Sequence, residues 1–217
     1  MTMMKKNVLL LMFVLLGTTS NMIAADVNNE SANQYVTNAL IKADVSNDSA
    51  TLLTCIDNLK RIHRFFPNNW LATYYQDFYS LRYALLYNKD KNYSLLEEVK
   101  ESLSEMEYDE DADLSEIYTL YGFYNYVSLC NDPKQEINAC NDEIMKWCDK
   151  AIQLNPQNPR PRLLKILFKQ TASKILGVKA KDESEEIAKI KELFKNDSVT
   201  VPNPAWGKEL LSMITNN

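Results

Sequence analysis

Glycine and histidine are scarce in this chain. Its 217 residues include only 4 glycines and a single histidine, whereas an average glycine usage of about 7 % would give roughly fifteen glycines. Glycine supplies the left-handed turns of β-hairpins and the close backbone approach to phosphate groups. The scarcity therefore excludes a nucleotide-binding glycine loop and a sandwich of many tight turns, and it leaves an α-helical protein with polar loops.

The single histidine also limits the chemistry that the chain offers. A catalytic base must lie within hydrogen-bond reach of a nucleophile, and His63 falls on the apolar stripe of a predicted helix, where we expect a structural role. The acidic stretch 109–116 does not fit a calcium loop, because Leu114 and Leu120 stand where that loop needs glycine and glutamate. We therefore predict that the protein is not an enzyme and binds neither a metal nor a cofactor.

The first 25 residues have the organisation of a secretory signal peptide. Lys5 and Lys6 precede an apolar run over residues 8–16, and a polar stretch then leads to Ala25. The run is shorter than the roughly 17–25 residues of a membrane span, and the first cysteine, Cys55, lies far from the cleavage point of a lipoprotein. We expect a periplasmic or secreted protein with no lipid anchor and no integral membrane segment.

Negative charge dominates the remainder of the chain. The whole sequence has 24 Lys and Arg against 29 Asp and Glu, and its formal net charge is −5. Loss of the two leader lysines leaves 22 basic against 29 acidic residues, which makes the net charge −7. Because binding to a phosphate backbone draws on clustered Lys and Arg, we do not expect nucleic acid as a partner.

Apolar residues recur at steps of three and four from Ser31 onward, a pattern that predicts helices almost throughout. The breaks fall at capping residues and prolines. We expect helices over residues 31–42, 49–66, 69–87, 94–106, 113–130, 132–154, 159–177 and 182–196. Residues 197–204 alternate valine and proline and predict an extended arm, followed by a short helix that carries Trp206 and docks on the last helix pair.

The expected helices form pairs that begin near residues 31, 69, 113 and 159. This spacing is close to the length of helical solenoid repeats, and short loops favour antiparallel packing of neighbouring helices. The predicted organisation is a signal peptide (1–25), a helical repeat domain of about four helix pairs (26–196), and an extended arm with a C-terminal helix (197–217).

One run of the sequence resembles the end of a tetratricopeptide repeat. In residues 147–159, WCDKAIQLNPQNP, Ala151 precedes the helix-stopping Pro156 by five positions. The alanine lets two helices approach closely and the proline fixes the corner to the next repeat. Gly122, after Tyr121, stands where that family has its Leu-Gly pair.

The resemblance is weaker elsewhere, since residues 66–70 only repeat the proline corner and Ile144 and Cys148 replace the usual Ala and Phe. It implies an all-α fold in which antiparallel helix pairs stack as a short right-handed solenoid, with a short C-terminal docking helix. Together with the leader and the tail over 201–207, the chain looks like the secreted tetratricopeptide-type proteins of Bacteroidetes-like bacteria. Such a resemblance implies a scaffold or binding module.

Most of the 12 tyrosines fall between Tyr74 and Tyr126, and the first helix of each pair lines the concave face of a solenoid. This register predicts a partner-binding set made of Tyr75, Tyr79, Arg82, Thr119, Phe123, Tyr126 and Arg160. Aromatic rings with polar tips and an arginine are typical of peptide-binding hot spots. Rings buried between helices would show the same spacing, and stacking of a glycan on the rings is a third interpretation.

The four cysteines all follow the leader and face an oxidising compartment. Cys130 and Cys140 flank the predicted turn at 132–133, at the same height on facing helices, so we expect a Cys130–Cys140 disulfide. The alternative is that all four cysteines are buried thiols that fill small gaps in the core.

These patterns predict a non-catalytic secreted or periplasmic helical-repeat protein that binds a protein or peptide through a concave aromatic face. The alternative is an envelope-associated all-α protein that binds carbohydrate through the same face.

Overall fold

The computed structural model describes residues 29–41, 43, 46–87, 93–132, 137–197 and 200–215, and every regular element in them is a helix. The predicted signal peptide lies outside these residues. A first helix over residues 29–41 is followed by α2 (Ser49–Phe65), α3 (Trp70–Leu86), α4 (Tyr93–Met106), α5 (Leu114–Asn131), α6 (Ile137–Leu154), α7 (Arg160–Leu176), α8 (Ser184–Asn196), the short 3-10 helix η2 (Lys208–Leu210) and α9 (Leu211–Thr215).

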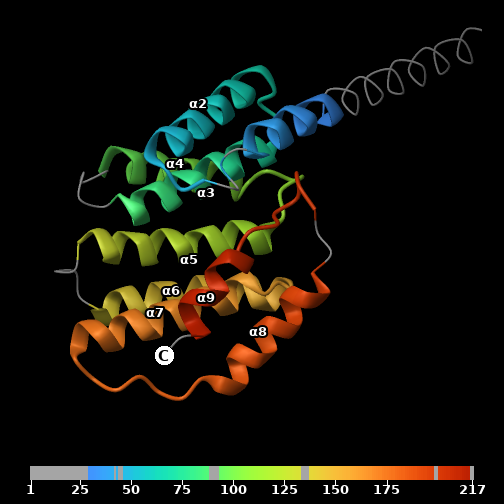
Figure 1. Cartoon of the computed structure of the whole chain (residues 1–217). Coiled ribbons are helices and arrows are strands. Elements are labelled where there is room, and N and C mark those ends of the chain that lie inside the picture. Colours follow the sequence, from blue (N-terminus) through green and yellow to red (C-terminus); the bar gives the residue numbers. More distant parts are fainter. Residues whose placement is uncertain are drawn as a thin grey trace, which may run out of the picture.

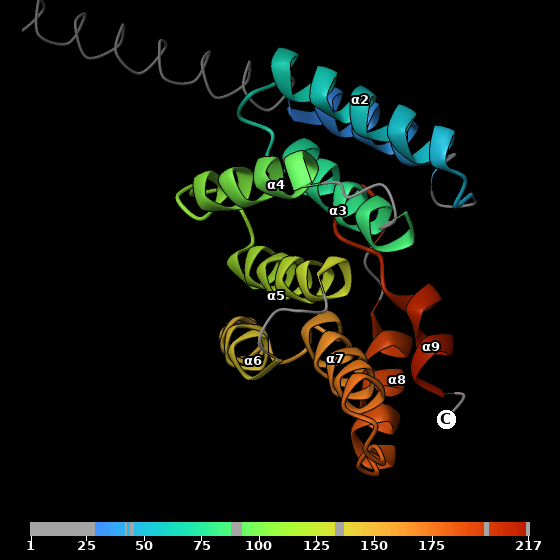
Figure 2. The same cartoon turned by 90° about the vertical axis from the view of Figure 1, so that its left-hand side faces the viewer.

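The helices stack as packed pairs, which confirms the predicted fold class. Successive pairs follow one another from α2 at one end of the molecule to α8 at the other (Figure 1). The alternate helices α3, α5 and α7 also contact one another directly. Helices α4 and α6 lie on one side of this row, whereas α8 lies on the other side, next to α9 (Figure 2). The row α3, α5 and α7 is therefore an inner layer, and α4 and α6 form an outer layer on one side of it.

Local side-chain chemistry sets the helix ends where the sequence predicts them. Asn69 caps α3, since its Oδ1 accepts a hydrogen bond from the backbone N–H of Ala72 at 3.1 Å. Asp113 caps α5 by accepting from the N–H of Ser115 at 2.8 Å. Gly177 ends α7 in the left-handed conformation, with φ 65°. The predicted cap of α6 at Pro133 lies outside the described residues.

Burial distinguishes the two layers. Eleven of the 17 residues of α3 and ten of the 18 residues of α5 are buried, against three of 18 in α6. An apolar stripe on one side suffices for an outer helix, whereas an inner helix packs on several sides. At Gly122 an added Cβ would lie 2.7 Å from the Sγ of Cys148, so this glycine permits the close approach of α5 and α6.

The C-terminal segment, residues 200–214, lies along the side of α3, α5 and α7 (Figure 2). Helix α9 packs on α7 and α8, as the sequence predicts. Trp206 precedes this helix and reaches beyond the last pair, since its ring stacks on Phe78 of α3 at 4.8 Å and on Phe123 of α5 at 5.7 Å between ring centroids. Helices α3 and α5 thus supply an aromatic slot that buries the indole.

Candidate binding site on the inner face

The inner face is the side of α3, α5 and α7 on which residues 200–214 lie, and its middle is an aromatic layer. Positions three and four apart on a helix share one side, and this spacing places Tyr75, Phe78 and Tyr79 of α3 together. Phe78 lies 5.1 Å from Tyr79 and 6.2 Å from Phe123 of α5 between ring centroids. Trp206 covers this layer and is only 6 % exposed.

Side chains of the inner face hold the C-terminal segment largely through its backbone carbonyls. The hydroxyl of Tyr75 donates to the carbonyl of Asn203 at 2.8 Å, and the guanidinium of Arg160 donates to the carbonyl of Pro204 at 2.5 Å. The indole N–H of Trp206 donates to the hydroxyl of Tyr74 at 2.6 Å. Residues 200–203 form a turn, in which the backbone N–H of Asn203 donates to the carbonyl of Thr200 at 3.1 Å. The segment is therefore bound through its carbonyls and one aromatic side chain, as a peptide is bound in a groove.

A buried ionic network lies next to the aromatic layer. Arg160 pairs with Glu116 at 3.3 Å and with Asp197 at 3.0 Å, and its side chain is 3 % exposed. Glu116 also accepts hydrogen bonds from Tyr74 at 2.6 Å and from the amide of Asn158 at 2.9 Å. Burial raises the pKa of Glu116 to about 7 although Arg160 opposes this shift, and burial also raises the pKa of Tyr74.

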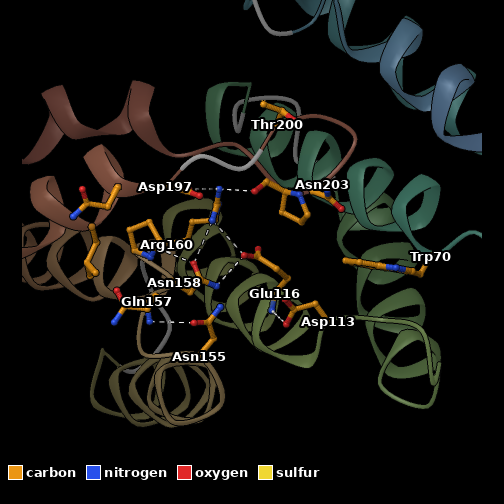
Figure 3. A pocket seen from close by; sticks show the side chains of 14 residues that line it. Trp70, Asp113, Glu116, Asn155, Gln157, Asn158, Arg160, Asp197, Thr200 and Asn203 are labelled. Atoms are coloured by element: carbon orange, nitrogen blue, oxygen red, sulfur yellow. Dashed lines mark hydrogen bonds and ion pairs between the residues drawn. The ribbon is translucent and has the colours of Figure 1, made fainter.

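A polar cavity of about 510 Å³ opens beside this network (Figure 3). It lies between the N-terminal ends of α3, α5 and α7, the C-terminal end of α8, and the start of the C-terminal segment. Its lining consists of Trp70, Asp113, Glu116, Asn155, Gln157, Asn158, Pro159, Arg160, Leu193, Asn196, Asp197, Thr200, Asn203 and Pro204. Amides and carboxylates thus form most of its wall, and Trp70 is its one aromatic side chain.

A smaller cavity of about 150 Å³ lies at the aromatic layer, between Tyr75, Tyr79 and Arg82 of α3 and residues 201–209. The guanidinium carbon of Arg82 is 5.8 Å from the centre of the Tyr79 ring, and Arg82 donates to the side chain of Asn47 at 2.6 Å. This end of the inner face is therefore aromatic and carries one cation.

Five of the seven predicted partner-binding residues lie next to the C-terminal segment: Tyr75, Tyr79, Arg82, Phe123 and Arg160. Tyr75, Tyr79, Phe123 and Tyr126 are all 4 % exposed or less, so they pack between elements as well as facing one side of the stack. Their part in partner binding stays a prediction, and a partner would reach them only in place of residues 200–206.

Two predicted residues take part in local contacts within and between helices. The hydroxyl of Thr119 donates to the carbonyl of Ser115 within α5 at 2.7 Å. The hydroxyl of Tyr126 lies 3.1 Å from that of Thr171 on α7. Thr119 is fully buried, so its side chain has a packing role in this state of the molecule.

The predicted partner-binding set does not include Glu116, Asn158 or Trp70 of the polar half of the site. The available signal was a carboxylate in the first turn of α5 that is followed by apolar residues, since Glu116 precedes the buried Ile117 and Leu120. An acid at such a position needs a buried partner, and Arg160 after Pro159 supplies the charge.

The remaining candidate groups lie away from the inner face. His63 of α2 is half-buried, and its Nδ1 lies 2.9 Å from the hydroxyl of Thr73 on α3. Cys130 and Cys140 are half-buried thiols at the contact of α5 and α6, and their disulfide stays a prediction. Within the described residues, no three His, Cys, Asp or Glu side chains converge as a metal ion requires.

The fold and the site define an all-helical protein of stacked pairs with a covered inner face. The chain is similar to the HusA haemophore from Porphyromonas gingivalis, with a TM-score of 0.69 over 85 % of this chain and 89 % of that one, at 23 % sequence identity. At this identity the similarity concerns the fold. No protein-family model and no curated protein sequence matches the chain. Among the helices of the described residues, none combines the length and apolar character of a membrane span.

Proposed function

We propose that this protein is a non-catalytic binding protein that acts in the periplasm or outside the cell and holds a peptide segment of a partner protein on its inner face. The observation that carries the proposal is the chain's own segment, residues 200–206, which lies on this face. Tyr75 and Arg160 bind its carbonyls, and Trp206 fills a slot between Phe78 and Phe123.

The contacts that hold the C-terminal segment would also suit a peptide from another protein. Hydrogen bonds to backbone carbonyls do not depend on the side chains of the ligand, and a buried aromatic anchor with an arginine beside it is typical of hot spots. We expect the partner segment to present an aromatic side chain. It would compete with the C-terminal segment of this chain for the same slot.

The hydrogen bonds of the buried carboxylate of Glu116 favour a binding function over a catalytic one. The carboxylate of Glu116 accepts from Tyr74, Asn158 and Arg160, and Arg160 also neutralises Asp197. A carboxylate engaged by three donors is a structural group rather than a free general base.

The test uses a Trp206→Ala variant, which empties the slot, and a labelled synthetic peptide with the sequence of residues 200–210. We expect the peptide to bind the variant, seen as a rise in fluorescence anisotropy, and to raise its melting temperature. The intact chain should bind it much more weakly, because its own Trp206 fills the slot. A matched peptide with alanine in place of Trp206 should not bind.

A folded Trp206→Ala variant that binds neither peptide would overturn the proposal. Circular dichroism of the variant separates this outcome from loss of the fold. Met213→Ala, a change at an exposed position of the same segment, serves as the control and should behave as the intact chain does.

Haem is a second candidate ligand, and the observation that favours it is the likeness to a haemophore. Under the C-terminal segment lies a broad layer of aromatic rings, with Arg82 beside Tyr79 and Arg160 beside Trp206. With the C-terminal segment displaced, a planar macrocycle with two carboxylates would find stacking partners there and a cation at Arg82. Haem titration of the Trp206→Ala variant, followed by the Soret band, tests this: saturable binding that the 200–210 peptide displaces supports haem, and an unchanged free-haem spectrum contradicts it.

A further inference from the structure

The polar cavity of Figure 3 has a different chemistry from the aromatic layer and is a separate candidate site. The N-terminal ends of α3, α5 and α7 meet at its wall, marked by Trp70, Asp113 and Arg160. Helix N-termini carry partial positive charge, and here the carboxylates of Asp113 and Glu116 lie beside them. Three carboxylates, those of Asp113, Glu116 and Asp197, line the cavity against the single guanidinium of Arg160, so the helix ends and Arg160 offset only part of the negative charge.

Two ligand classes fit these walls poorly. An anion would face Asp113, Glu116 and Asp197, while the guanidinium of Arg160 is already bonded to two carboxylates and to a carbonyl. An apolar ligand would take water from the amides without replacing its hydrogen bonds. The walls therefore favour a neutral ligand that both donates and accepts hydrogen bonds.

A rigid turn presents two of the amides. The Oδ1 of Asn155 accepts a hydrogen bond from the backbone N–H of Gln157 at 3.1 Å, which fixes the turn between α6 and α7. Gln157 is exposed at the rim, and Asn155 is half-buried beside it. A turn that is ordered before binding loses little conformational entropy when a ligand arrives.

Trp70 supplies an aromatic surface at the wall of the same cavity. It is the first residue of α3 and is half-buried. Its ring lies edge-on to Tyr74, with 5.6 Å between ring centroids, and this packing fixes its position. The electron-rich face of an indole packs well against the C–H groups of a sugar ring.

We infer that the polar cavity binds a neutral saccharide, with Trp70 against the face of one sugar ring and the amides of Asn155 and Gln157 on its hydroxyl groups. The cavity shares Arg160 and residues 200–204 with the proposed peptide site as parts of its wall, but the side chains that would contact the saccharide, Trp70, Asn155 and Gln157, take no part in holding the peptide. A volume of about 510 Å³ suits a short oligosaccharide.

The experiment titrates the purified exported protein with two neutral trisaccharides, cellotriose and triacetylchitotriose, and with the anionic trigalacturonate, by calorimetry. We expect saturable binding of at least one neutral trisaccharide and none of the anionic one. Gln157→Ala and Trp70→Ala should each weaken binding about fivefold to tenfold, the effect of one lost hydrogen bond or one lost stacking contact. Gln153→Ala changes an exposed residue of α6 outside the cavity and should leave binding unchanged.

Three outcomes would overturn the inference: absence of binding to the folded protein, equal binding by Gln157→Ala and Gln153→Ala, or preference for the anionic sugar. If Trp70→Ala does not fold, Gln157→Ala still tests the inference, because Gln157 is exposed and its substitution leaves the fold intact. Binding of the 200–210 peptide to Trp206→Ala is measured separately, so failure of the saccharide site and failure of the peptide site are distinguishable.

Discussion

The two ends of the inner face hold the same C-terminal segment by different means. At the aromatic end, an indole is buried against Phe78 and Phe123. At the polar end, Arg160 joins the segment to Glu116 through charge and hydrogen bonds. Burial of apolar area is insensitive to pH and to exact geometry, whereas a buried ion pair depends on both. The aromatic end should therefore supply stability, and the polar end should fix the position of the segment.

Removal of the aromatic anchor is expected to have the largest effect. Trp206→Ala leaves a cavity between α3 and α5 and should lower the free energy of unfolding by about 3–5 kcal/mol. Urea unfolding followed by circular dichroism measures it. Met213→Ala, in the same segment but 48 % exposed, should stay within about 0.5 kcal/mol of the intact protein. Equal losses in both variants would contradict the assignment of stability to the aromatic end.

Removal of the cation at the polar end should have the next largest effect. Arg160→Met leaves the buried Glu116 without its partner and should cost about 3 kcal/mol at pH 8. The loss should shrink at pH 5, because protonation neutralises Glu116. Urea midpoints at the two pH values measure this difference. An equal loss of unfolding free energy at pH 5 and at pH 8 would show that Arg160 acts through packing alone.

Titration of Glu116 should give an effect no larger than that of Arg160→Met and the sharpest contrast between the two ends. Its pKa of about 7 in the folded protein lies above the ordinary value of 4.5, so the folded state binds the proton more tightly than the unfolded state. The resulting stability is present below pH 4.5 and is lost as the pH rises through 7, by up to about 3 kcal/mol. Glu116→Gln should remove this slope, whereas Trp206→Ala should keep it. Unfolding curves from pH 4 to 8 test both.

The fold was largely predictable from the sequence because its determinants are local. Asn69 and Gly177 mark helix ends by chemistry that a few residues decide, and Gly122 was interpretable as a close helix contact because the repeat pattern placed it there. Solenoid packing follows from such pairs without long-range information.

The site was only half predictable, because its decisive contacts join distant residues. The spacing of Tyr75, Tyr79 and Phe123 fits residues that line a groove and equally fits residues that pack in a core. Only the position of Trp206 in the structure shows that these rings are covered. The pairing of Glu116 with Arg160 joins α5 to α7. No local pattern encodes such a pair, since it depends on how the helix pairs stack.

The bonds that join the C-terminal segment to α3 span more than half of the 217 positions. Trp206 meets Tyr74 across 132 positions, and Asn203 meets Tyr75 across 128. Ribosomes synthesise α3, α5 and α7 before they reach Trp206. A nascent chain therefore carries its aromatic layer uncovered until Trp206 has been made, and a product that stops before Trp206 would keep that layer open to chaperones and proteases.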